Sequence, residues 1–211
     1  MTGVSRVDRV VTAGIFALDE QEWEVENNVW LVGDDEEVLV VDAAHDAEAI
    51  RAAIGGRRVV AILLSHGHND HINAAPALAE ATGTPPVYLH ADDLMLWHQV
   101  FPETNPDRWL TDGLEVSVAD TTVAVVHTPG HSPGGCCLWD GAGTLFSGDT
   151  LFRGGPGATG RTFSDFPTII ASIKERLLVL PPETVVHTGH GADTTIGEEA
   201  PHLDEWIARG Y

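Results

Sequence analysis

The chain has 211 residues, a formal net charge of −21 at pH 7, and 43% hydrophobic residues. This length and composition fit one globular domain over residues 1–211 that buries its own core. Binding to phosphates needs clustered lysine and arginine, so the strong acidity argues against nucleic acid and anionic membranes as partners. A small molecule held by a few local groups is the partner that this charge leaves open.

The N-terminal segment lacks the apolar core of a signal peptide, and no apolar run is long enough for a membrane-spanning helix. Cys136 and Cys137 are adjacent, so a disulfide between them would be strained. We expect both to be small apolar residues of a buried strand. These features predict a cytoplasmic protein.

The first part of the chain alternates between short strands and helices. Helices are indicated by alanine-rich and leucine-rich segments that close on glycine, and strands by β-branched apolar runs. The pattern predicts strands over residues 7–18, 27–33, 37–43, 57–66 and 85–90, and helices over residues 46–56, 70–83 and 91–97.

The second part begins with a hairpin over residues 114–130, where apolar and polar residues alternate on both sides of a turn. A helix over residues 164–180 has an apolar stripe and a cap at Ser164 or Asp165. The remaining expectations are strands over residues 134–140, 143–152 and 183–190, a glycine-rich loop over 153–161, and a helix over 198–210. Two strand-rich halves with amphipathic helices predict an α/β (α+β) sandwich of two sheets with helices outside.

The most informative stretch is "SHGHNDH", residues 65–71, which directly follows the apolar strand 57–66. Imidazole and carboxylate are ligands that suit zinc, iron, manganese or nickel. His66 and His68 are two residues apart, so both can project to the same side of an extended strand end. Asp70 and His71 begin the next helix and point elsewhere. Two adjacent metals could use all four side chains, whereas a single metal could hardly do so.

Two metals need more ligands, and three further motifs offer them. His131 lies in "TPGHSPG", Asp149 in "SGDTLF" and His190 in "HTGHG", each beside small residues that leave room for a metal. If Asp149 bridges, five histidines and two aspartates give each metal four protein ligands. A lone histidine in a turn usually has an ordinary structural role, which we assign to His45, His90, His98, His127, His187 and His202.

In this order the four motifs resemble those of the metallo-β-lactamase superfamily, and "GHGADTTIGEE" is similar to the glyoxalase II (hydroxyacylglutathione hydrolase) subgroup. The resemblance extends from about Val29 to Glu199. It implies a four-layer αββα metallo-β-lactamase sandwich with the metals at one edge. It also implies a first metal on His66, His68 and His131, a second on Asp70, His71 and His190, a bridge at Asp149, and a role for Asp42 in orienting the ligand loop.

The chemistry of such a centre favours hydrolysis of an activated acyl group. Two divalent metals, zinc above iron or manganese, can bridge a water and lower its pKa, from about 15.7 to about 7 in favourable single-zinc sites. The resulting hydroxide attacks the carbonyl, and a metal stabilises the oxyanion. Asp70 and Asp149 would orient this nucleophile or relay its proton. The prediction is a metal-dependent hydrolase of a small-thiol thioester.

Other functions share parts of this pattern. Persulfide dioxygenases use one iron at the positions of His66, His131 and Asp149, and lactonases of the superfamily share the whole ligand set. True β-lactamases are exported and typically lack the bridging aspartate, which this chain has at position 149. A metal-dependent binding domain is the alternative that is not an enzyme.

The sequence does not identify the acyl group of the substrate or its carrier thiol. Glyoxalase II enzymes hold glutathione with a C-terminal helical region, and the segment after His190 has no match for it, so mycothiol or coenzyme A are alternatives. Arg161, after "GGPGATG", is the nearest candidate for contact with a substrate anion. Trp97, Phe101 and Trp109 either line an apolar pocket or pack a long loop. No pattern indicates an oligomeric state.

Overall fold

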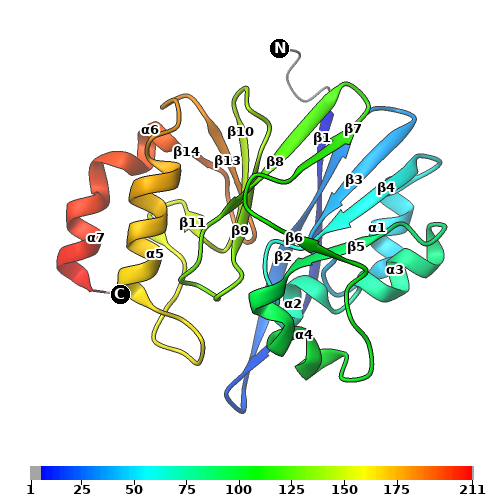
Figure 1. Cartoon of the computed structure of the whole chain (residues 1–211), viewed down its shortest axis with the longest axis horizontal. Helices are drawn as coiled ribbons and strands as arrows, with labels where there is room; N and C mark the ends of the chain where they lie inside the picture. Colours follow the sequence, from blue (N-terminus) through cyan, green and yellow to red (C-terminus); the bar gives the residue numbers. More distant parts are fainter. Residues whose placement is uncertain (1–5, 211) are drawn as a thin grey trace.

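The computed structural model describes residues 6–210 and centres on two six-stranded sheets (Figure 1). The N-terminal sheet has the strand order β1 to β6 and runs antiparallel from β1 to β3 and parallel from β3 to β6. Its strands are β1 (Arg6–Leu18), β2 (Gln21–Gly33), β3 (Glu37–Val41), β4 (Arg58–Leu63), β5 (Val87–His90) and β6 (Arg108–Leu110).

The C-terminal sheet has the order β14-β13-β10-β9-β8-β7, and only the β10–β13 pair is parallel. Its strands are β7 (Glu115–Val118), β8 (Thr121–His127), β9 (Cys136–Trp139), β10 (Thr144–Gly148), β13 (Val185–Thr188) and β14 (Thr194–Thr195). A separate small hairpin is formed by β11 (Leu151–Phe152) and β12 (Gly155–Pro156).

Helices cover the outer face of each sheet (Figure 1). The N-terminal sheet carries α1 (Ala47–Ile54), α2 (Asn69–Ile72), α3 (Ala75–Ala81), the short 3-10 helix η1 (Ala91–Asp93) and α4 (Leu94–Val100). The C-terminal sheet carries α5 (Phe166–Ser172), its wider continuation η2 (Ile173–Leu177), α6 (Ile196–Glu199), η3 (Ala200–His202) and α7 (Leu203–Arg209). No helix within residues 6–210 is long and apolar enough to cross a membrane.

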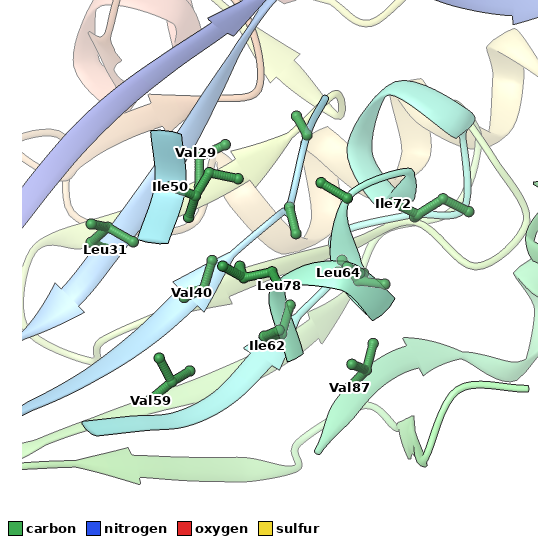
Figure 2. Close-up of a cluster of buried hydrophobic side chains, with 14 of the residues drawn as sticks. Val29, Leu31, Val40, Ile50, Val59, Ile62, Leu64, Ile72, Leu78 and Val87 are labelled. Carbon is green, nitrogen blue, oxygen red and sulfur yellow. The ribbon is translucent and has the colours of Figure 1, made fainter. Parts of the chain in front are cut away.

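Alternation along the strands builds three apolar layers between these four layers of elements. In β3, Val38 and Val40 face the outer helices, whereas Leu39 and Val41 face the other sheet. Figure 2 shows the outer cluster, where Val40 and the β4 residue Ile62 lie with side chains of the covering helices. A second cluster fills the space between the sheets, and a third lies under α5 and α7. The predicted αββα sandwich is confirmed.

Several predicted boundaries differ from the structure for local reasons. Strand β2 begins at Gln21 rather than Asn27, because β1 and β2 form one long hairpin whose charged tip carries no apolar run. The helix expected over residues 70–83 is two helices, and Pro76, which lacks an N–H, stands at the start of the second. The strand expected over residues 143–152 breaks after Gly148, and β6 has no counterpart in the sequence-based prediction.

Other local expectations are confirmed. The hairpin expected over residues 114–130 is β7 and β8. Asp165 caps α5, since its side chain accepts a hydrogen bond from the backbone N–H of Thr168. Cys136 and Cys137 are free thiols in β9 and are both buried, in two different apolar clusters.

Candidate metal centre

The seven predicted ligand residues lie together, although they come from four separate segments. His66 and His68 lie in the loop that follows β4, Asp70 and His71 lie in α2, and His131 lies in the turn between β8 and β9. Asp149 directly follows β10, and His190 follows β13. Because β10 and β13 are parallel neighbours, their carboxyl ends reach the same edge and bring these two residues side by side. The fold therefore supplies four residues of the cluster from the N-terminal sheet and three from the C-terminal sheet.

The first triad consists of His66, His68 and His131. His68 Nδ1 lies 3.0 Å from His66 Nε2 and 3.0 Å from His131 Nε2. Burial lowers the pKa of His68 to about 3 and the pKa of His66 well below its usual value. One proton on His68 Nδ1 cannot fully satisfy both neighbouring Nε2 atoms, so three ring nitrogens converge in an arrangement that a cation would stabilise.

Hydrogen bonds at the opposite ring nitrogens orient these imidazoles. His131 Nδ1 donates to the backbone oxygen of Ala158 at 2.9 Å. His66 Nδ1 donates to Ser65 Oγ at 3.0 Å, since that hydroxyl gives its own proton to Asp42. Both rings therefore keep their Nε2 lone pairs free for a metal. His68 Nε2 is buried and has no hydrogen-bond partner among the described residues.

The second triad consists of Asp70, His71 and His190. His190 Nε2 lies 3.2 Å from His71 Nε2 and 3.3 Å from Asp70 Oδ2. His71 Nδ1 donates to Asp42 at 2.8 Å, and His190 Nδ1 donates to the backbone oxygen of Glu26 at 2.7 Å. Again the outer nitrogens are used and the Nε2 atoms converge, as in metal-ligating histidines.

Asp149 touches both triads. Its Oδ2 lies 3.3 Å from His190 Nε2 and 3.6 Å from His131 Nε2, and its Oδ1 lies 3.4 Å from His71 Nε2. Only glycine fits at position 189, because a Cβ there would lie 2.2 Å from Asp149 Oδ1. The carboxylate thus lies between the two triads, within 3.6 Å of a histidine of each.

Protons balance the charge of the second triad when no metal is bound. Burial alone would lower the pKa of His190, but the carboxylates of Asp149 and Asp70 raise it to about 10. Burial likewise opposes a charge on His71, yet Asp149 and Asp70 raise its pKa well above the usual value. In turn His71 brings the pKa of Asp70 to about 2 against the effect of burial. The carboxylates of Asp70 and Asp149 therefore stabilise positive charge in the second triad.

Asp42 lies where an orienting residue was expected. Its carboxylate accepts hydrogen bonds from the backbone N–H of Ser65 at 2.7 Å, from Ser65 Oγ at 2.9 Å and from His71. Asp42 has a φ of 59°, a left-handed conformation that is costly for a residue other than glycine and that clusters at functional sites. It connects the end of β3 to both ends of the ligand loop.

Sequence reasoning missed Asp93, which ties together the two loops of the first triad. Its buried carboxylate accepts hydrogen bonds from the backbone of Gly67 at 2.8 Å, from Ser132 Oγ at 2.7 Å and from the backbone of Gly134 at 2.6 Å. Gly67 separates His66 from His68, and Ser132 follows His131. An aspartate next to apolar residues in "ADDLMLW" was the available signal.

A pocket of about 200 Å³ opens onto the cluster and contains Arg161. The guanidinium carbon of Arg161 lies 4.1 Å from the ring centroid of Trp23 and 5.3 Å from that of Phe16. Stacking of this kind holds a cation in place by attraction to the aromatic faces. The aromatic wall near Arg161 therefore comes from the β1–β2 hairpin.

The aromatic residues of the long loop lie elsewhere. Trp97 is buried, with its ring centroid 4.8 Å from that of Phe101, and both belong to the outer apolar cluster. Trp109 is exposed and does not line the pocket at the metal-ligand cluster. Trp97 and Phe101 thus pack the outer cluster, and none of the three residues lines this pocket. His45, given an ordinary structural role above, instead contacts Asn27 beside the second triad.

The two triads, the carboxylate between them and the four-layer sandwich are typical of one class of metal-binding proteins. The model of the metallo-β-lactamase superfamily matches residues 23–190, so the chain belongs to this superfamily. The hydroxyacylglutathione hydrolase GloC of Haemophilus influenzae is 31% identical over 190 residues, which cover 82% of this chain and 90% of that protein.

Two solved structures are also similar to this chain. The BLEG-1 B3 metallo-β-lactamase is 31% identical with a TM-score of 0.77, and the match covers 92% of this chain and 99% of that one. TTHA1623, solved in a di-iron-bound form, is 39% identical with a TM-score of 0.75, over 83% of this chain and 93% of that one. The likeness includes both metal-binding and hydrolytic relatives.

Proposed function

We propose that this protein is a dinuclear metal-dependent hydrolase of a small-thiol thioester, similar in chemistry to glyoxalase II. The observation that carries the proposal is the pair of triads joined by Asp149 at the base of a pocket. The hydroxyacylglutathione hydrolase among the relatives supports the thioester. The proposal includes a single domain over residues 1–211, a cytoplasmic location and a small molecule as the partner.

Each triad would hold one divalent metal, zinc in the first instance, with iron supported by the di-iron relative and manganese as the remaining alternative. Bound metals would supply a water of lowered pKa and an electrophile for the carbonyl oxygen. Asp70 Oδ1 is buried without a hydrogen-bond partner among the described residues, as expected of a group that awaits a metal or a water. Asp70 and Asp149 would also orient the attacking water and accept its proton.

Arg161 would bind an anionic group of the substrate. Arg161 lines the same pocket as His68, His131 and Asp149, and its guanidinium is held by aromatic stacking. No carboxylate of the described residues forms a close ion pair with it. In a chain with a net charge of −21, such a cation beside a metal centre attracts a carboxylate on the acyl group or the carrier.

The test combines metal analysis with a substrate panel. The protein is loaded with zinc, iron or manganese, its metal content is measured, and hydrolysis is followed with acylated glutathione, mycothiol and coenzyme A. Two metals per chain and turnover of a thioester above all other classes are the expected result. One iron per chain, with oxygen consumed on glutathione persulfide, would replace the hydrolase by a dioxygenase.

Hydrolysis of β-lactams is the second candidate, since a structure named as a B3 metallo-β-lactamase is 31% identical and matches over nearly its full length. The panel therefore includes a penicillin, a cephalosporin and a simple lactone. A β-lactam turned over faster than every thioester would overturn the main proposal in favour of this one.

A further inference from the structure

A chain of polar side chains leads from the backbone of His45 to the second triad. The backbone N–H of His45 donates to Asn73 Oδ1 at 2.6 Å, so the other end of that amide, Nδ2, is the donor toward His45 Nδ1 at 3.1 Å. Because Nδ1 accepts, the proton of the neutral imidazole lies on Nε2. His45 Nε2 then donates to Asn27 Oδ1 at 2.9 Å.

The direction of every hydrogen bond in this chain is therefore fixed by one backbone N–H. With Asn27 Oδ1 used as the acceptor, Asn27 Nδ2 faces the triad as a donor and lies 3.0 Å from Asp70 Oδ2. The same nitrogen is 3.3 Å from His71 Nε2 and 3.4 Å from His190 Nε2. Asn27 is completely buried, so its amide has no access to bulk solvent.

The backbone near Asn27 is arranged so that the His45 ring can contact it. His45 adopts a φ of 60°, which an L-residue rarely takes without a compensating contact. A Cβ at Gly14, on the neighbouring strand β1, would lie 2.2 Å from His45 Nδ1, so only glycine leaves room for the ring. Burial lowers the pKa of His45, in keeping with the neutral ring that accepts at one nitrogen and donates at the other.

We propose that Asn27 is a positioning residue of the second metal site, with His45 as its support. The amide holds the carboxylate of Asp70 as an anion in one orientation toward His71 and His190, and so pre-organises that triad. The inference rests on the proposed dinuclear centre and names a residue outside its ligand set. Residues beyond the ligands that hold them in this way typically contribute about 10- to 100-fold to metal affinity.

The experiment titrates metal-free protein with Zn²⁺ alone and follows binding by calorimetry and by metal content after gel filtration. Asn27→Leu, with a similar volume and no polar group, should weaken one of two equivalents by about 10- to 100-fold while the other is unchanged. His45→Phe, which touches no ligand, should weaken the same equivalent to a smaller extent. Asn27→Ser serves as a milder variant if Asn27→Leu does not fold.

A control separates positioning from a general loss of buried hydrogen bonds. Thr194 is buried in β14 and donates to Glu199 at 2.6 Å, so Thr194→Val removes a buried hydrogen bond away from the triads. It should lower the unfolding temperature and leave both equivalents unchanged. Equal weakening of both equivalents by Asn27→Leu, or no weakening, contradicts the role of Asn27. A single equivalent in the unmodified protein contradicts the dinuclear centre itself, and both outcomes are independent of any substrate.

Discussion

His71 donates its Nδ1 proton to Asp42 across 2.8 Å, and neither side chain is more than 2% exposed. The same carboxylate holds the backbone and the hydroxyl of Ser65, at the start of the ligand loop. One buried carboxylate therefore fixes both the orientation of the His71 ring and the path of the loop that carries it. The orientation of His71 depends on this contact, although Asp42 belongs to neither triad.

Asp42→Asn should weaken metal binding by about 10- to 100-fold, because an amide cannot accept from His71 and Ser65 in the same way. It should also lower the free energy of unfolding by about 3 to 5 kcal/mol, the usual effect of breaking a buried charge pair. Zinc titration and chemical denaturation measure the two effects. Asp46→Asn caps α1 equally well and serves as the control, since Asp46 lies outside both triads. Unchanged zinc affinity in Asp42→Asn would contradict the orienting role.

Asp149→Ala should lower the metal content below two ions per chain. It should also reduce turnover by more than about 100-fold, which is the upper end of the effect of orienting residues. The reason is that this carboxylate contacts histidines of both triads. Metal analysis and thioester turnover are measured together. Asp165→Asn, which retains the cap of α5, is the matched control. Two metals and full turnover in Asp149→Ala would exclude a bridging role.

Arg161→Gln should raise KM about 10-fold or more for a carboxylate-bearing thioester, since a hydrogen bond to a charged group contributes about 1.5–3 kcal/mol. The value of kcat should stay unchanged, because the guanidinium binds substrate and touches no reacting atom. Arg153→Gln removes an exposed arginine whose ion pair is with Glu198 at 3.9 Å, and its KM should not change. A KM that rises equally for charged and neutral substrates would point to a distorted pocket instead.

The metal-free protein should lose stability as the pH rises from about 6.5 to about 10. The pKa of His190 is raised from 6.5 to about 10 by Asp149 and Asp70, so its protonated form stabilises the fold fully below the lower value. That contribution disappears as the pH passes through the higher value. Unfolding temperatures of chelator-treated protein measure the effect. Protein saturated with zinc should lack this decrease, and an identical pH profile for the two forms would contradict the assignment.

Metal binding should release protons for the same reason. His71 and His190 carry protons in the metal-free centre, and both must lose them before their Nε2 atoms can bind a metal. Zinc calorimetry in buffers of different ionisation enthalpy measures the number released, which should approach two near pH 7. Release of no protons would mean that the second triad is neutral before the metal arrives.

The sequence predicts those parts of the centre that depend on short spacing. His66, His68, Asp70 and His71 stand within one loop, and the layered fold follows from the alternation of residues such as Val40 and Val41. Asn27 and Asp93 were not predicted, because their roles arise from contacts between distant segments and a lone amide or carboxylate has no spacing signature. For Asn27 a signal existed, since it shares a strand face with the buried Val29.

The predicted boundaries of helices and strands were wrong where a local feature interrupts the apolar pattern. Pro76 starts a new helix in a segment that otherwise resembles one continuous helix. Gly148, with a φ of 49°, ends a strand in the middle of an apolar run and aims Asp149 at the cluster. The interruption at Gly148 places Asp149 in the cluster. A prediction from the apolar pattern alone therefore could not locate this break.

Each ion would be shared between the two halves of the chain. His66 and His68 come from the N-terminal sheet and His131 from the C-terminal one, and His71 and His190 are divided in the same way. Neither half alone can assemble a complete coordination sphere, so metal uptake reports that both halves have folded and docked. Metal binding would therefore stabilise only the state in which both halves are folded and in contact, and a chain with one half unfolded would not bind the ion in this site.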